Sequence, residues 1–237
     1  MSLQNKVAYI TGGTKGIGYG VAKALLDQGM RVAISGRKLA DAEAAAKDLS
    51  EDSSRVLGLA SDVTKLGDEQ EAVSKIIATW GQLDVVLANA GVGHFAAVDK
   101  MEDAHWHQMI DTNLTGAFHT LKASVEALKT SKGYYMTLAS LAGTNFFAKG
   151  AGYNASKFGV VGFTQATMLD LRPYDIKVTT IMPGSVATYF NNHVPEDADA
   201  WKIQPEDIGK LVIDLLQMHP RTLPSKIEVR PTRPDLK

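Results

Sequence analysis

A glycine-rich stretch near the start of the chain is the feature that most constrains its fold. The sequence Thr11-Gly12-Gly13-Thr14-Lys15-Gly16-Ile17-Gly18 stands between the apolar run Val7–Ile10 and the helix-forming run Val21–Leu26. A strand, a glycine-rich turn and a helix in that order are what a dinucleotide-binding βαβ unit requires. The helix's first turn then offers free N–H groups and its dipole to an anion. We expect a pyrophosphate-binding turn built from Gly12, Thr14, Lys15, Gly16, Ile17 and Gly18.

Short β-type runs alternate with longer helical patterns over nearly the whole chain. The predicted strands are Lys6–Thr11, Arg31–Ser35, Val56–Ser61, Val85–Asn89, Gly133–Leu138, Ile176–Met182 and Lys226–Val229. The predicted helices are Gly16–Gln28, Lys38–Leu49, Gly67–Trp80, Asp103–Thr130, Ala151–Leu171 and Pro205–Met218. This alternation predicts one α/β domain over residues 1–237, a Rossmann-like, doubly wound parallel sheet of about seven strands with helices on both faces. Only residues 189–204 resist the pattern, and we expect them to form a loop that acts as a substrate lid.

Composition excludes several classes of function. The formal net charge of −1 gives no electrostatic reason to bind nucleic acid or an anionic membrane. The chain has no cysteine, so disulfides and thiolate chemistry are excluded. No apolar run is long enough to span a bilayer and the first residues do not resemble a signal peptide, so a cytoplasmic location is expected. His105 and His107 point apart on a helix, so no metal site is predicted.

The segment after the second predicted strand bears on the choice of dinucleotide. A carboxylate that binds the ribose 2′-OH of NAD is expected there, but the sequence reads Ser35-Gly36-Arg37-Lys38 and has no acid before Asp41. Arg37 has a planar fork suited to a phosphate, and Lys15 adds a second cation. This pattern favours a 2′-phosphate and hence NADP(H), although both cations can also be solvated surface charges.

A tyrosine and a lysine four residues apart are the candidate reactive groups. Tyr153 and Lys157 lie on one face of the predicted helix, where a cation is expected to stabilise the phenolate and make the phenol an acid-base group. Ser140 follows a strand, at the edge that holds the glycine turn, and can orient a carbonyl oxygen. Asn113 lies in the middle of a predicted helix, where it can hold a water next to Lys157. In isolation, a Tyr–Lys pair with this spacing is more often simply part of a surface helix.

Together these motifs resemble those of the short-chain dehydrogenase/reductase family. In order along the chain the matching segments are Thr11–Gly18, Asp62-Val63, Ala88-Asn89-Ala90-Gly91, Asn113, Ser140, Tyr153-xxx-Lys157 and Pro183-Gly184. The resemblance runs from about Lys6 to about Thr188. It implies an oxidoreductase in which Asn113, Ser140, Tyr153 and Lys157 act as the catalytic tetrad.

The resemblance also implies the remaining cofactor contacts. Besides the glycine turn, Tyr153 and Lys157, these are Arg37, Lys38, Asp62, Val63, Asn89, Ala90, Gly91, Pro183, Gly184, Val186 and Thr188. Asp62 and Val63 would contact the adenine, and the residues after Pro183 would surround the nicotinamide. The cationic second turn is similar to the NADP-preferring branch. A homodimer or homotetramer is expected by the same resemblance.

Three functions remain open. The preferred one is an NADP(H)-dependent oxidoreductase acting on a small carbonyl compound or secondary alcohol. A 3-oxoacyl-[acyl-carrier-protein] reductase is the second, although the C-terminal segment Ile227–Pro234 differs from the Val-Asp/Asn-Gly-Gly segment of many such enzymes. A non-catalytic NADP-binding regulator is the third. Most of the predicted substrate-lining residues are apolar; they are His94, Phe95, Phe146, Phe147, Met182, Tyr189, Phe190 and Trp201. All three functions leave the identity of the substrate, the direction of the reaction and its stereochemistry open.

Overall fold

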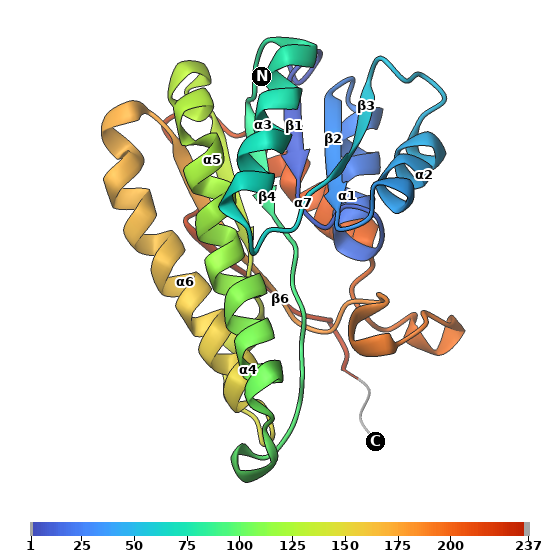
Figure 1. Ribbon diagram of the computed structural model, residues 1–237, viewed down its shortest axis with the longest axis vertical. Coiled ribbons are helices and arrows are strands. Elements are labelled where there is room, and N and C mark those ends of the chain that lie inside the picture. Colours follow the sequence, from blue (N-terminus) through green and yellow to red (C-terminus); the bar gives the residue numbers. More distant parts are fainter. Residues whose placement is uncertain (1, 235–237) are drawn as a thin grey trace.

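Seven parallel strands form one sheet in the computed structural model, which describes residues 2–234 (Figure 1). The strands are β1 (Val7–Ile10), β2 (Arg31–Gly36), β3 (Val56–Ala60), β4 (Val85–Ala88), β5 (Tyr134–Leu138), β6 (Lys177–Pro183) and β7 (Lys226–Val229). Their order is β3-β2-β1-β4-β5-β6-β7, so the winding direction reverses between β1 and β4. Ligands bind at such a reversal, outside the carboxyl ends of the strands. The predicted fold class is confirmed; residues 1 and 235–237 of the predicted 1–237 domain lie outside the described residues.

Two layers of helices cover the sheet. On one face lie α1 (Gly16–Asp27), α2 (Leu39–Leu49) and α7 (Pro205–Gln217), and on the other α3 (Leu66–Trp80), α4 (Asp103–Met109), α5 (Gly116–Ser131) and α6 (Ala151–Leu171). Alternate residues of β1 enter opposite cores: Ala8 and Ile10 pack on the α1 and α7 side, Val7 and Tyr9 on the α3 and α5 side. Such double burial explains why the strands are apolar runs.

The prediction of one helix over Asp103–Thr130 is wrong in one respect. A π-helical segment, Ile110–Thr115, separates α4 from α5. The wider π turn carries Asn113, whose side chain bonds to the backbone of Val92 in the loop after β4. Because these bonds come from a distant part of the chain, local helix periodicity gives no sign of the change.

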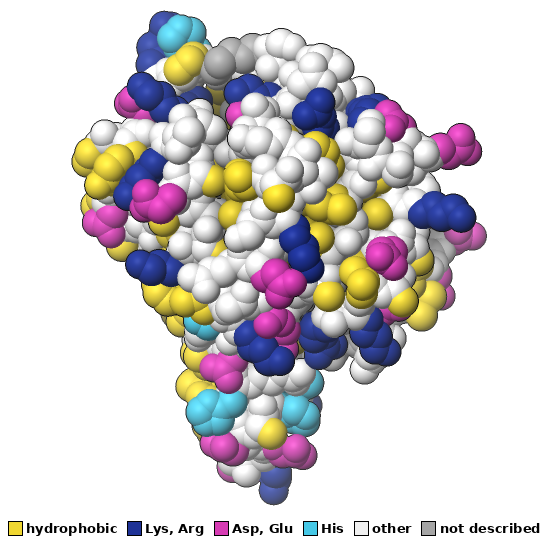
Figure 2. Space-filling model, turned by 45° about the horizontal axis from the view of Figure 1, so that its top comes forward, with side chains coloured by type: hydrophobic (Ala, Val, Ile, Leu, Met, Phe, Trp, Pro, Cys, Tyr) yellow, Lys and Arg dark blue, Asp and Glu magenta, His cyan; other side chains and the backbone are white. Residues whose placement is uncertain are grey.

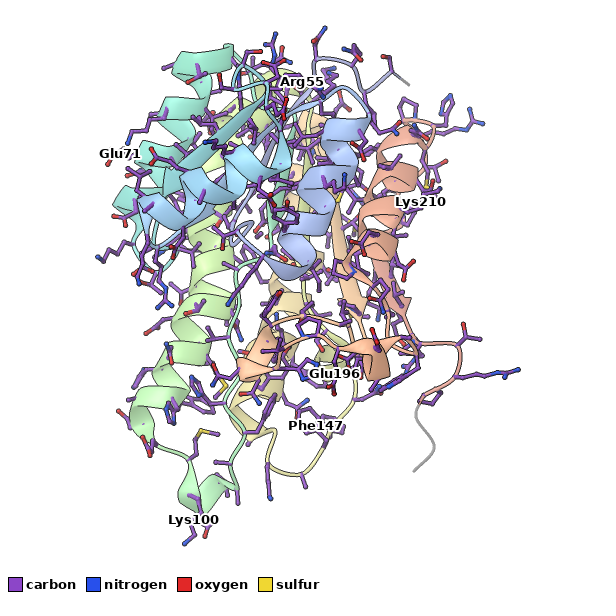
Figure 3. All side chains as sticks on the ribbon, turned by 90° about the vertical axis from the view of Figure 1, so that its right-hand side faces the viewer. Arg55, Glu71, Lys100, Phe147, Glu196 and Lys210 are labelled. Carbon is purple, nitrogen blue, oxygen red and sulfur yellow. The ribbon has the colours of Figure 1, made fainter. Side chains whose placement is uncertain are left out.

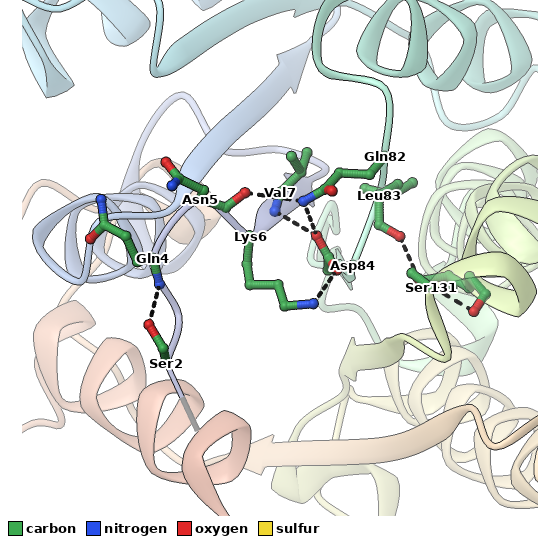
Figure 4. A network of polar contacts seen from close by, with 10 residues as sticks. Ser2, Gln4, Asn5, Lys6, Val7, Gln82, Leu83, Asp84 and Ser131 are labelled. Atoms are coloured by element: carbon green, nitrogen blue, oxygen red, sulfur yellow. Dashed lines mark hydrogen bonds and ion pairs between the residues drawn. The ribbon is translucent and has the colours of Figure 1, made fainter.

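A polar network fixes the edge of the sheet opposite the site (Figure 4). Asp84 accepts hydrogen bonds from the Lys6 ammonium at 2.7 Å and from the backbone N–H of Val7 at 2.8 Å. Gln82 donates to the same carboxylate at 2.9 Å. The network therefore ties the start of β1 to the start of β4, the two strands at which the winding reverses.

Residues 189–204 contain more structure than the sequence predicted. Two short 3₁₀ helices, Phe190–Asn192 and Asp197–Asp199, lie within them, and a parallel bridge between Val186 and Ile203 closes their base. Inside the loop, Asp199 pairs with both His193 and Lys202. Ion pairs within the loop therefore hold its two halves together.

The face of the molecule drawn in Figure 2 shows no large region of one charge. In Figure 2, basic and acidic side chains are interspersed over the visible face, in agreement with the formal net charge of −1. Within residues 2–234, no helix combines the length and apolar character needed to cross a membrane.

Candidate active site

The glycine turn after β1 has the backbone conformation that glycine favours. Gly12 has a φ of 63° and Gly16 a φ of 61°, both in the left-handed region. A Cβ at Gly12 would lie 2.9 Å from the Cα of Ala90, and one at Gly18 would lie 2.6 Å from the amide nitrogen of Asn89. The spacing of these glycines is therefore required by the close approach of the turn after β4.

Asn89 and Thr11 join the two turns into one unit. The Asn89 amide donates to the carbonyl oxygens of Thr11 at 2.8 Å and Gly12 at 3.0 Å. In return, the Thr11 hydroxyl accepts from the backbone N–H groups of Asn89 at 3.0 Å and Ala90 at 3.2 Å. Thr11 was not among the predicted site residues, and its place at a strand end before the first glycine is the signal that could have identified it.

A cationic pocket lies beside the carboxyl ends of β1 and β2. Its volume is about 500 Å³, and its lining residues are Thr14, Lys15, Gly36, Arg37, Lys38 and Asp41. Three cations face one carboxylate, so the pocket suits an anionic group. The structure thus brings together Lys15, Arg37 and Lys38, the three cations that the sequence predicted to contact a dinucleotide.

Asp62 and Val63 follow β3 and are held in place by local bonds. The Asp62 carboxylate accepts from the backbone N–H of Thr64 at 3.1 Å and from its hydroxyl at 2.8 Å. The Val63 carbonyl lies 3.0 Å from a ring nitrogen of His119 on α5. Both predicted residues therefore have fixed positions at the carboxyl edge.

Glu69 lies beneath this segment, and the sequence did not predict its part in the site. It is buried and accepts hydrogen bonds from the hydroxyls of Ser61 at 2.5 Å and Tyr9 at 2.9 Å. Burial raises the pKa of the Glu69 carboxyl. An acid in the first turn of a helix is usually solvent-exposed, so only the packing shows that this one anchors the end of β3.

The segment after β6 faces the glycine turn. A Cβ at Gly16 would lie 3.4 Å from the side chain of Thr188. Gly184 donates its N–H to the carbonyl oxygen of Val229 at 2.8 Å, and Val186 forms the bridge to Ile203. Pro183 is the last residue of β6. Thr188 therefore lies beside the glycine turn, and we call the segment from Pro183 to Thr188 the wall of the candidate site.

Asn113, Lys157 and Gly91 meet behind the site. A Cβ at Gly91 would lie 3.3 Å from Asn113 Oδ1 and 3.5 Å from Lys157 Nζ. The Asn113 amide accepts from the N–H of Val92 at 2.8 Å and donates to its carbonyl and to the Ser156 hydroxyl, both at 2.9 Å. Lys157 donates to the carbonyl oxygen of Leu138 at 2.9 Å. Asn113 is thus held in place by protein atoms on both sides of its amide.

Tyr153 lies next to this group on α6. Lys157 Nζ is 5.7 Å from the centroid of its ring. Burial raises the pKa of the Tyr153 phenol to about 12, while the neighbouring Ser140 hydroxyl acts in the opposite direction. Burial also lowers the pKa of the Lys157 ammonium to about 8. The nearby cation was expected to lower the pKa of Tyr153, but burial raises that pKa instead; near neutral pH the phenol is protonated and most of Lys157 is charged.

The fold and this site define the class of α/β proteins that bind a dinucleotide at a glycine turn. The chain belongs to the short-chain dehydrogenase/reductase family, because the family model described as short chain dehydrogenase matches residues 6–199. The resemblance inferred from the motifs is therefore confirmed, and with it the general class of oxidoreductase.

Full-length relatives agree with this assignment. An uncharacterized oxidoreductase of Staphylococcus saprophyticus is 31% identical over 233 residues, covering 98% of this chain and 99% of the relative. An alcohol dehydrogenase from the archaeon Thermococcus sibiricus, solved with 5-hydroxy-NADP, superposes with a TM-score of 0.91 at 29% identity and covers 98% of this chain and 100% of that one. A 3-ketoacyl-(acyl-carrier-protein) reductase from Brucella melitensis, solved with NADH, has a TM-score of 0.89 at 26% identity, with 98% and 99% covered.

Proposed function

We propose that this protein is an NADP(H)-dependent oxidoreductase that transfers a hydride between nicotinamide and a carbonyl compound or secondary alcohol. The observation that carries the proposal is the half-buried Tyr153 beside Lys157 and Ser140, at the edge of the sheet that holds the glycine turn. Gly12 and Gly18 have no side chains, so Ala90 and Asn89 pack closely against them. The backbone of the turn is therefore free to approach a pyrophosphate.

The chain's own residues supply the proton and the orientation. When bound, NADPH would supply a hydride to the carbonyl carbon. Ser140 donates a hydrogen bond to the carbonyl oxygen and holds it, and Tyr153 transfers its phenolic proton to that oxygen, which leaves an alcohol and a phenolate. Lys157 stabilises the phenolate through its charge. Asn113 acts as a positioning residue, since it holds the backbone of Val92 and thereby keeps the preceding Gly91 close to Lys157.

The preference for NADP(H) over NAD(H) rests on the cationic pocket. Arg37 can form a bidentate contact with a 2′-phosphate, while Lys15 and Lys38 add charge to the same pocket. The two structural neighbours differ in this respect, one having been solved with an NADP derivative and the other with NADH. The proposal for this chain therefore depends on its own residues.

Tyr153→Phe tests the chemistry. The substitution removes the proton donor and keeps the ring, so we expect turnover of the best carbonyl substrate to fall by roughly 10²- to 10⁴-fold. NADPH binding, followed by nicotinamide fluorescence, should persist. A Phe variant that oxidises NADPH at the wild-type rate would refute the role of Tyr153.

Arg37→Asp tests the cofactor. The wild-type protein should have the higher kcat/KM with NADPH, and the variant should lower the NADPH-to-NADH ratio by about 10- to 100-fold, since a charged phosphate contact is replaced by repulsion. The matched control is Arg221→Asp, at an arginine outside the pocket. An unchanged ratio in the Arg37 variant would contradict the assignment.

Two other functions are distinguished by the same assays. The Brucella melitensis neighbour supports a 3-oxoacyl-[acyl-carrier-protein] reductase, which would prefer a 3-oxoacyl thioester to simple ketones. A non-catalytic NADP-binding regulator would bind NADPH but turn over none of these compounds. We further propose that residues 189–204 act as the substrate lid and that the protein is a homodimer or homotetramer. The expected cytoplasmic location stays a prediction.

A further inference from the structure

Three phenylalanine rings form a contact network that includes Tyr153: Phe95 and Phe190 contact the tyrosine, and Phe147 contacts Phe95. Phe95 follows β4, Phe147 follows β5 and Phe190 follows β6. The Tyr153 ring lies 5.5 Å from Phe95 at an interplanar angle of 75°, and 5.7 Å from Phe190 at 52°. Phe95 also contacts Phe147 at 5.8 Å and Phe190 at 6.5 Å. We call Phe95, Phe147 and Phe190 the phenylalanine cluster; Figure 3 shows Phe147 at the same end of the molecule as Glu196 and Lys100.

Two glycines make room for these rings. A Cβ at Gly93 would lie 2.5 Å from Cζ of Phe190, and one at Gly150 would lie 2.6 Å from Cε2 of Phe147. Any side chain at either position would displace a ring. The backbone on both sides of the site is therefore shaped to hold aromatic side chains beside Tyr153.

The cluster is not closed by the protein. Phe95, Phe147 and Phe190 remain 40%, 46% and 37% exposed. The neighbouring Phe146 differs, because it stacks on Phe158 at 5.2 Å and 2° and is not among the rings around Tyr153. The cluster thus presents unfilled aromatic faces and edges to whatever approaches the phenol.

We propose, on the basis of the proposed function, that the phenylalanine cluster selects carbonyl compounds with an aryl ring next to the carbonyl group. Phe190, carried by the loop 189–204, contacts the Tyr153 ring in a tilted arrangement, which shows that the face of the phenol accepts an aromatic ring. Edge-to-face and offset aromatic pairs gain more than their buried area alone provides, about two- to tenfold in affinity for each pair. In the reaction the carbonyl carbon gains the hydride from NADPH and its oxygen gains the Tyr153 proton, which gives a benzylic secondary alcohol and NADP⁺.

The test compares two ketones with the same carbon skeleton. Acetophenone and cyclohexyl methyl ketone differ in the aromaticity of one six-membered ring, so their kcat/KM ratio with NADPH measures the value of that property. We expect a ratio of about 10 for the wild-type protein. Phe95→Leu and Phe190→Leu keep an apolar side chain but remove an aromatic partner, and each should lower the ratio about threefold or more.

Phe146→Leu is the matched control, because it changes a phenylalanine in the same loop as Phe147 that contacts Phe158 instead. Its ratio should equal that of the wild type. Equal kcat/KM values for the two ketones in the wild-type protein, or an equal fall of the ratio in the Phe146 variant, would overturn the selection of aryl substrates while leaving the reductase function intact. Failure to reduce any carbonyl compound with bound NADPH would instead overturn the proposed function.

Discussion

Lys157 holds a charged amine in a place where only 4% of its surface is exposed. The carbonyl oxygen of Leu138 is the hydrogen-bond acceptor that the fold provides for it, at 2.9 Å. Burying a cation without a carboxylate partner is costly, and the fall of its pKa to about 8 expresses that cost. Lys157 therefore destabilises the folded protein.

Replacing this cation should stabilise the protein. In Lys157→Met, a similar length of chain is kept without the charge, so we expect the free energy of unfolding to rise at pH 7 by on the order of 3 kcal/mol. Turnover should be lost in the same variant. Chemical denaturation followed by circular dichroism measures the change, with the exposed Lys23→Met on α1 as the control.

The increase in the free energy of unfolding caused by Lys157→Met should depend on pH. The pKa of Lys157 in the folded state, about 8, lies below its ordinary value, so above about pH 8 the unfolded chain binds more protons than the folded one. The destabilisation is therefore complete below about pH 8 and is relieved as the pH rises toward the ordinary value. The difference between the two proteins should be largest near pH 7 and shrink above pH 8; a Met variant that is less stable at pH 7 would show that Lys157 stabilises the fold.

Elements whose ends are marked by local chemistry were predictable from the sequence. The predicted bounds of α6 and β7 agree with the structure, and α3 ends at Trp80 because Gly81 adopts a φ of 76° there. Parallel strands also place their carboxyl ends at one edge, which is why Ser140 and Asn89 could be assigned to the same site as the glycine turn.

Other features of the same elements depend on contacts between distant segments. The π-helical turn at Asn113 exists where its amide meets Val92, and no local pattern encodes that meeting. Phe146 and Phe147 are neighbours in the sequence, yet Phe147 contacts Phe95 of the cluster whereas Phe146 stacks on Phe158. The same holds for Glu69, since burial distinguishes it from any other acid on a helix.

At the scale of the whole molecule, one outer helical layer leaves large apolar side chains uncovered. Phe118 on α5 and Phe158 and Leu169 on α6 are exposed. Phe118 contacts Phe163 of α6 at 6.3 Å, so exposed apolar side chains of the two helices lie next to each other. We propose that the homodimer or homotetramer forms through this face of α5 and α6.

A charged side chain on this face should dissociate the oligomer. We expect the wild-type protein to be a dimer or tetramer by light scattering and Leu169→Glu to shift it toward smaller species, because a buried unpaired carboxylate costs several kcal/mol. Leu39→Glu is the control, since Leu39 is equally exposed but lies on α2, on the opposite side of the sheet. A monomeric wild-type protein would refute this interface.

The bond between Gly184 and Val229 links the last strand to the wall of the site. Pro231, two residues further on, lies within 3.2 Å of the position that a Cβ of Gly184 would occupy. Pro231 thus lies at the carboxyl edge of the sheet, next to the candidate site, whereas the start of the chain lies at the opposite edge (Figure 1). An affinity tag or fused reporter at the start of the chain is therefore expected to disturb the candidate site less than one joined beyond Pro231, which packs against Gly184.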